Sequence, residues 1–286
     1  MATASRGMAL IAVLWIVAAL SIMVTGLTAT VRQQIQITGV QRDQTSGLAL
    51  GEAAIALALQ ELAASRQRPL GIVSATVPYA GVEVEVEVAP LNGLISLNGA
   101  SVDLLAALLQ FAGELDAGQA QALAQTLVEW RDGLPQLDLT ADAAARSAPR
   151  RFEAPEDLLL VPGVDYALYA RVAPLVSTDL AGINRVNPQA APPGVLAVLA
   201  QGDQGRVARF VDQRTGGQPG GADASGFQPA FVSTGGTDLY RLQARVPLEA
   251  GKILLLTRDV ALGATYSRTA PWRILRTERQ IAAHPG

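Results

Sequence analysis

The sequence has no cysteine and only one histidine, His284, near the C-terminus of its 286 residues. Disulfide frameworks and thiol chemistry are therefore excluded. A single terminal imidazole also excludes histidine-based triads and multi-histidine metal sites. No P-loop and no dinucleotide-binding fingerprint occurs. A membrane-anchored hydrolase is an alternative, but the nucleophile, base and orienting group that it needs are missing.

Positive charge is scarce as well. The chain has 22 Lys and Arg residues against 25 Asp and Glu, which gives a net charge of −3. No stripe of basic residues interleaved with aromatic ones is present, so the composition argues against a nucleic-acid partner. The length is sufficient for one or two folded domains besides an anchor.

Charge is absent altogether from residues 8–30, which are mostly apolar. As a helix this run would extend about 35 Å, enough to cross the ~30 Å hydrocarbon core of a bilayer. A cleaved secretory signal has a shorter core, yet the small residues of "TGLTAT" resemble its cleavage site. A simple signal anchor, with Arg6 on the cytoplasmic side, is the other alternative.

A helical pattern continues beyond the apolar run, because no proline occurs before Pro69. Apolar residues recur with the spacing of an amphipathic helix at Leu48, Ile55, Leu59 and Leu62. The pattern predicts a helix to about Leu62. Four glycines, each costing about 1 kcal/mol of helix propensity, predict local melting: Gly26, Gly39, Gly47 and Gly51.

Strands are predicted on both sides of a helical middle. Valine alternates with glutamate over 82–88, which indicates a strand with one solvated face, although the glutamate row could also be a cation-binding ladder. Asn92-Gly93 predicts a turn into a second strand, 94–97. The residues from 240 to 279 contain three more strand patterns.

The middle of the chain carries helical periodicity. Two helices are expected in 101–133, the second capped by Asp116 and ended by Gly133. Shorter helices are expected in 153–176 and from Pro192-Pro193 onward, followed by a glycine-rich loop at 215–236. This order predicts an α+β fold in which a helical domain interrupts a sheet.

Several segments together resemble one known family. The stretches "RGMALIAVLWIVAALSI", "LNGLISLN", "WRDG", "FEAPEDLLLVPGVDYALYARVAPLVS" and "NPQAAPPGVLAVL" occur in the order expected of the general secretion pathway protein K family. The block at 152–176 is the most specific of them. The family comprises minor pseudopilins of the type II secretion system.

This resemblance implies processing of the N-terminus. Prepilin peptidase would cleave between Gly7 and Met8 and N-methylate Met8. Most proteins with such a leader carry Glu at the fifth mature position, where this chain has Ala12. Protein K typically lacks that Glu, whereas a minor type IV pilin-like subunit for adhesion or DNA uptake, the alternative reading, would retain it.

The resemblance also implies a pilin-like fold, with a long N-terminal helix on an antiparallel sheet and an inserted α domain of helix-hairpin-helix-like repeats. The expected divisions are a leader at 1–7, a transmembrane half-helix at 8–30, pilin-like parts at 31–100 and 235–286, and the insert at 101–234. The protein would be single-pass in a bacterial inner membrane, with its bulk in the periplasm. Its implied partners are minor pseudopilins I, J and H, prepilin peptidase, the secretin and exoprotein.

Relatives carry an acidic "Gly-Ala-Glu-Asp" stretch, associated with calcium, after the Trp-Arg-Asp segment. This chain lacks that stretch, so calcium is an alternative rather than a requirement. Four residues could supply its oxygen ligands: Asp132, Asp138, Asp142 and Glu153. A solvated acidic loop near Arg146, Arg150 and Arg151 is the favoured interpretation.

Overall fold

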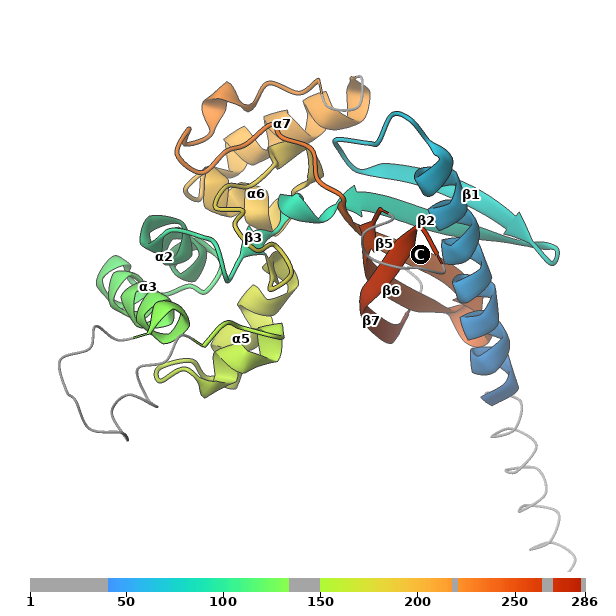
Figure 1. Ribbon diagram of the computed structural model, residues 1–286, viewed down its shortest axis with the longest axis horizontal. Coiled ribbons are helices and arrows are strands. Elements are labelled where there is room, and N and C mark those ends of the chain that lie inside the picture. Colours follow the sequence, from blue (N-terminus) through green and yellow to red (C-terminus); the bar gives the residue numbers. More distant parts are fainter. Residues whose placement is uncertain (1–40, 134–149, 218–220, 264–269, 284–286) are drawn as a thin grey trace, which may run out of the picture.

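The computed structural model describes residues 41–133, 150–217, 221–263 and 270–283 (Figure 1). It combines a helix-backed antiparallel sheet with a helical region, residues 91–238, which we call the head. The α+β class expected from the sequence is confirmed. The apolar segment at 8–30 and the leader lie outside the described residues.

The sheet has five strands in the order β1-β2-β5-β6-β7, and all neighbours are antiparallel. The strands are β1 Val73–Tyr79, β2 Val82–Pro90, β5 Leu239–Leu248, β6 Lys252–Leu262 and β7 Trp272–Ala283. The predicted strand at 82–88 and the three C-terminal strands are confirmed. β1 was not predicted. It joins β2 through Ala80 and Gly81, whose positive φ angles of 51° and 81° suit a two-residue hairpin turn.

The N-terminal helix, Gln41–Ala64, packs on one face of the sheet, which we call the inner face. Its end agrees with the prediction. The predicted melting is wrong at Gly47 and Gly51, because both lie within a continuous helix. A Cβ at Gly47 would lie 2.5 Å from Leu248 Cδ2, and one at Gly51 would lie 3.3 Å from Leu256 Cδ2. These glycines therefore let the helix approach the sheet closely.

This helix also has the length and apolarity of a membrane-crossing helix, by length and composition only. Its apolar stripe, however, is occupied by the sheet. Ile55 and Leu59 are 0% and 2% exposed among Val84, Val86, Leu242 and Leu256. The apolarity of this helix is thus explained by its role in the core of the sheet domain.

The head contains five described α-helices: α2 Val102–Phe111, α3 Ala117–Asp132, α5 Tyr166–Val172, α6 Pro193–Leu199 and α7 Gln204–Gly216. Short 3-10 segments join or flank them: η1 Leu91–Gly93, η2 Pro155–Leu160, η3 Ala173–Leu175, η4 Pro188–Ala190 and η5 Ala224–Gly226, with η6 Glu249–Gly251 between β5 and β6. The predicted cap is confirmed, since the Asp116 carboxylate accepts from Gln119 N at 2.9 Å. Gly133, with φ of 84°, ends α3 as expected. The helix-hairpin-helix-like character of the head stays a prediction.

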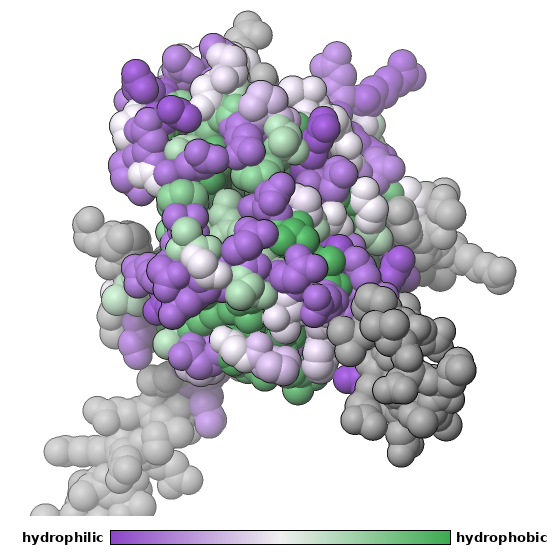
Figure 2. All heavy atoms as spheres, turned by 90° about the vertical axis from the view of Figure 1, so that its left-hand side faces the viewer, coloured by the Kyte–Doolittle hydropathy of each residue, from purple (hydrophilic) through white to green (hydrophobic). Residues whose placement is uncertain are grey.

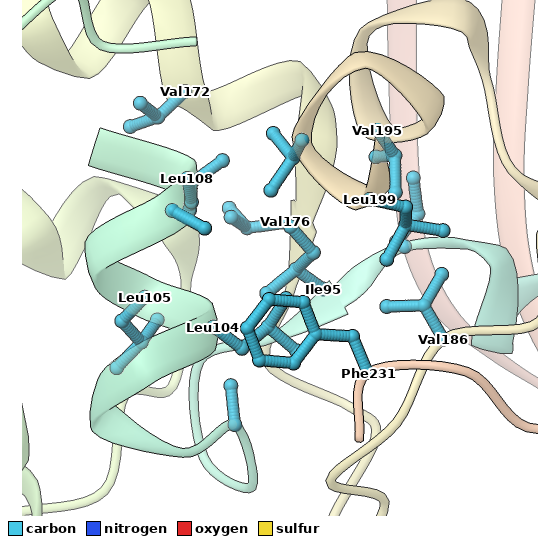
Figure 3. Packing of buried hydrophobic residues seen from close by; sticks show 14 of the residues in the cluster. Ile95, Leu104, Leu105, Leu108, Val172, Val176, Val186, Val195, Leu199 and Phe231 are labelled. Carbon is cyan, nitrogen blue, oxygen red and sulfur yellow. The ribbon is translucent and has the colours of Figure 1, made fainter. Parts of the chain in front are cut away.

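The head has a hydrophobic core of its own (Figure 3). Leu104, Leu105 and Leu108 of α2 meet side chains from the short helices α5 and α6, with Phe231 closing the cluster. The residues of this cluster are distinct from those beneath the N-terminal helix. Sheet and head are therefore two separately packed bodies of one chain.

The predicted hairpin at Asn92-Gly93 is wrong. The chain forms η1 there, and the short strand that follows, β3 Ile95–Ser96, pairs in parallel with β4 Val176–Ser177. A Cβ at Gly93 would lie 2.2 Å from the carbonyl oxygen of Ala190. Gly93 thus permits close contact with η4 rather than a two-residue turn.

In Figure 1 the sheet stands between the N-terminal helix on one side and the head on the other. On β2 the outer face carries Glu83, Glu85 and Glu87, in keeping with the predicted alternation. Glu85 and Glu87 lie 3.3 and 3.7 Å from the two guanidinium nitrogens of Arg245 on β5. The glutamate row thus faces a neighbouring arginine.

Candidate functional site at the junction of head and sheet

A cleft of about 360 Å³ lies between the outer face of the sheet and the head. The sheet side contributes Gln243, Thr257 and Glu278, which are in register on β5, β6 and β7. The head side contributes Pro155 and Glu156 from η2, Tyr169 from α5, and Pro174. This cleft is the junction of the two bodies.

A buried ion pair lies at the sheet side of the junction. Arg241 Nε and Nη2 donate to the two carboxylate oxygens of Asp259 at 2.7 and 2.8 Å. Asp259 is only 3% exposed. Burial alone would lower the pKa of Arg241, but the hydrogen bonds and charge of Asp259 outweigh it and raise the pKa. The pair joins register partners on neighbouring strands and so holds β5 to β6.

A second pair links head and sheet directly. Arg276 Nη2 of β7 donates to Glu156 Oε1 of η2 at 2.6 Å, across 120 residues of sequence. Burial would raise the pKa of Glu156, but a backbone hydrogen bond and Arg276 lower it. Burial, and then the charge of Glu156, raises the pKa of the neighbouring Tyr169. Glu156 is thus charged and held between two donors.

Asp179, just after β4, completes the charged cluster. Burial and then the nearby charge of Asp259 raise the pKa of Asp179, against the effect of three arginines. Clusters of shifted pKa values mark active sites, but structural ion-pair networks cause the same shifts. The described residues include no histidine, and the chain has no cysteine. The cluster can fix the position of the head relative to the sheet, and it lacks a nucleophile-base pair for catalysis.

Two of the four predicted calcium ligands lie within the described residues. Asp132 is held by its neighbour, because Arg131 Nε and Nη2 donate to its two carboxylate oxygens at 2.7 and 3.0 Å. This hydrogen bonding lowers the pKa of Asp132. Arg131 Nη1 also donates to the carbonyls of Leu97 and Ala100, at 3.3 and 2.9 Å. The Trp-Arg-Asp segment thus ties the end of α3 to the β3 region.

Glu153 is the other described acid of that set, and its side chain is exposed. Its backbone contacts are structural, since its N–H donates to Asp157 Oδ2 at 2.7 Å. Among the described residues no group of three or more His, Cys, Asp or Glu could hold a metal ion. The calcium site therefore stays a prediction. Asp138 and Asp142 lie outside the described residues, as do Gly7, Met8 and Ala12.

Sequence reasoning missed the residues of the junction. Three polar residues at alternate positions of β5, Arg241, Gln243 and Arg245, indicate a polar face of that strand. No local sequence pattern predicts the pairing of Arg276 with Glu156, because their contact depends on how the head is placed against the sheet. The junction could therefore be found only from the fold.

Exposed apolar side chains gather on the head within the block at 152–176. Leu159, Leu160 and Tyr166 are 41%, 65% and 73% exposed, whereas Leu158 beside them is 2% exposed. Figure 2, seen from the head side, shows apolar and polar residues interspersed over this face. These three residues are a candidate surface for contact with another subunit.

Comparison with known proteins agrees with the resemblance. Residues 90–178, from the end of β2 to just beyond β4, match the family model for "Type II secretion system (T2SS), protein K". No curated protein sequence matches the chain significantly. A chain in the crystal structure of the GspK-GspI-GspJ complex from the enterotoxigenic Escherichia coli type 2 secretion system is 16% identical, with a TM-score of 0.49, and the match covers 87% of this chain and 98% of that one. Over residues 90–178 the present chain is thus similar to the type II secretion system protein K family.

Proposed function

We propose that this protein is the minor pseudopilin at the tip of a type II secretion pseudopilus, where it initiates assembly and supports export of folded proteins across the outer membrane. The observation that carries the proposal is the protein K match over the first part of the head. That family is a structural component of the secretion machinery, and the role needs neither a catalytic site nor a cofactor. The ionic junction suits such a role, because it holds a large head in a fixed position on a pilin-like sheet.

The missing acid at mature position five supports a tip position. In pilin-like fibres a Glu there is thought to neutralise the α-amino group of the subunit above. An unpartnered carboxylate in lipid costs about 2.5 to 3.5 kcal/mol on insertion scales. A tip subunit has nothing above it, so Ala12 avoids that cost.

The shape of the head supports the same position. The head projects from the side of the sheet opposite to the N-terminal helix (Figure 1). A subunit with such a projection would clash with others stacked over it, which favours a place where nothing follows.

Processing of the N-terminus gives one test of the proposal. Prepilin peptidase should cut between Gly7 and Met8 and N-methylate Met8. N-terminal sequencing and mass spectrometry of the membrane-extracted protein should then find a methylated Met8. An intact Met1, or a start near residue 31, would contradict the proposal.

Partnership gives the deciding test. We propose that this protein forms the tip complex with minor pseudopilins I and J, and also H. Each chain would be anchored in the inner membrane with its bulk in the periplasm, where the complex would contact secretin or exoprotein. Affinity-tagged full-length protein should therefore recover I and J from detergent-solubilised membranes. A Leu160→Asp variant should recover less of them, while Glu153→Gln, an exposed substitution on the same block, serves as the matched control. Recovery of neither I nor J would remove the main support for the proposal.

A further inference from the structure

A groove of about 440 Å³ lies beside the N-terminal helix on the inner face of the sheet. Its walls are Gln44 and Leu48 of the helix and the end of the edge strand β7. The lining residues are Gln44, Leu48, Leu254, Arg279, Gln280 and Ile281. The groove lies on the opposite face of the sheet from the junction cleft, and Gln280 of the edge strand lines both.

The inner face of the sheet is one strand wider than the helix that covers it. On β6, Leu254 and Leu256 are 3% and 0% exposed beneath the helix. On β7, Ile274 and Ile281 occupy the same face, opposite Val260 and Leu254, and are 46% and 42% exposed. The apolar surface that binds the chain's own helix therefore extends onto β7, where it is exposed to solvent.

One lining residue, Arg279, gives the groove a charge preference. Arg279 is opposite Leu256, so it belongs to the inner face, and it is exposed. Arg279 makes no hydrogen bond or ion pair with any other described residue. Arg258, on the neighbouring strand, donates from Nη2 to Glu52 of the helix at 2.8 Å, but its buried Nε–H has no acceptor there. A carboxylate is the group that the free guanidinium of Arg279 fits.

The chain's own helix shows how such a pairing works. Its apolar stripe covers the sheet while Glu52, at the edge of that stripe, reaches Arg258. A second helix in the groove would repeat this arrangement with an acid facing Arg279. This charge complementarity distinguishes a helix with one acidic residue from a purely apolar segment.

The position of the groove indicates where that helix comes from. Gln44 and Leu48 lie near the start of the described helix, beside the β5–β6 turn, where Glu249 N donates to Asp43 at 3.0 Å. Ten residues separate residue 31 from Gln41, and these can reach at most about 35 Å in any conformation. On the proposed topology, the groove lies at the end of the sheet that faces the membrane.

We infer that this groove binds the apolar helix of a second membrane-anchored subunit, with an Asp or Glu of that helix paired to Arg279. The inference rests on the proposed function, since it takes the partner to be another minor pseudopilin. A second copy of this chain, residues 1–40 of the chain itself, and membrane lipid are the other occupants that the experiment must separate.

Photo-crosslinking of the full-length protein, co-expressed in membranes with I and J, tests the inference. The photoreactive amino acid p-benzoylphenylalanine replaces Ile281 in the groove or, as the matched control, Tyr79. Tyr79 is 46% exposed on the inner face of the opposite edge strand, so it has similar exposure without the groove. The expected product is a crosslink from position 281 to an apolar helix of I or J, identified by mass spectrometry, and none from position 79.

Charge variants then test the role of Arg279. Arg279→Glu should lower the crosslink yield about fivefold, and Arg279→Gln should lower it less, as expected for a partly exposed ion pair. Arg279 is exposed, so thermal unfolding of both variants should match that of the wild type. A crosslink at position 281 to lipid, to residues 1–40 or to a second copy would overturn the inference, as would none at all. If I and J still co-purify in that case, the proposed function stands; if neither co-purifies, both fail.

Discussion

Replacement of Gly93 by alanine tests the close contact between η1, where the head begins, and η4. The added Cβ would lie 2.2 Å from the carbonyl oxygen and 2.3 Å from the carbonyl carbon of Ala190. Ordinary contacts begin near 3.4 Å, so the overlap exceeds 1 Å, and it involves backbone that cannot rotate away. Overpacking of this kind costs about 1–3 kcal/mol, and a shift of η4 would also weaken the hydrogen bond from Asn187 N to Asn92 O, worth about 1 kcal/mol. We expect a loss of about 3 kcal/mol in the free energy of unfolding.

Urea unfolding of the detergent-solubilised protein, followed by tryptophan fluorescence, measures this loss. Two other glycines separate overlap from backbone strain. Gly216→Ala, at the end of α7, meets nothing within 4 Å and should change stability by less than about 0.5 kcal/mol. Gly182→Ala also meets nothing, but its φ of 76° should cost about 1 kcal/mol. If Gly93→Ala is no more destabilising than Gly182→Ala, the reasoning from close approach is refuted.

Three further predictions concern the tip, the junction and the metal. On the proposed tip position, the carboxylate of an Ala12→Glu variant would have no partner. The variant should therefore reduce secretion and shift crosslinks from position 12 toward subunits lower in the fibre. Unchanged secretion would argue against this account. Asp179→Asn should raise the melting temperature at pH 7, because burial and the charge of Asp259 raise the pKa of Asp179 and so disfavour its ionised form. That gain should be absent below about pH 3, where the carboxyl is protonated in both states. It should grow as the pH rises above the ordinary Asp pKa of about 3.9 and be complete above the raised pKa; no gain at neutral pH would contradict it. Removal of calcium with EGTA should shift the melting temperature by less than about 1 °C, because Arg131 already holds both oxygens of Asp132, and a drop of several degrees would show a bound ion.

Local signals predicted the elements that depend on local patterns. The valine alternation of β2 and the Asp116 cap of α3 both describe interactions within a few residues, and both are confirmed. β1 was not predicted, because Pro78 within the short run argues against a strand. The structure tolerates this proline because β1 is an edge strand.

Contacts between distant segments could not be predicted. The sequence Asn-Gly favours a hairpin, but the approach of η4 to Gly93 decides the geometry, and η4 lies almost a hundred residues later. The glycines of the N-terminal helix likewise predict local melting from the sequence alone. In the fold they face leucines of β5 and β6, and this packing keeps the segment helical. In each case the residue type indicates a local conformation, but a contact with a distant segment decides the conformation that forms.

The insertion of the head between β2 and β5 has a consequence for the order of folding. Pro90 and Tyr240 are cross-strand partners, so the whole head forms the loop of a single hairpin. Closing an unstructured loop of about 150 residues costs roughly 4 kcal/mol more entropy than closing a two-residue turn. A folded head brings its own ends together and removes that cost. Because β5 to β7 follow the head in the sequence, they are synthesised only after it. We expect pulse-labelled hydrogen exchange to show head amides protected before those of β5 and β6. Before those strands are formed, the apolar stripe at Ile55 and Leu59 has no complete sheet to pack against. We therefore expect the N-terminal helix to be bound by a chaperone or by the membrane surface during folding.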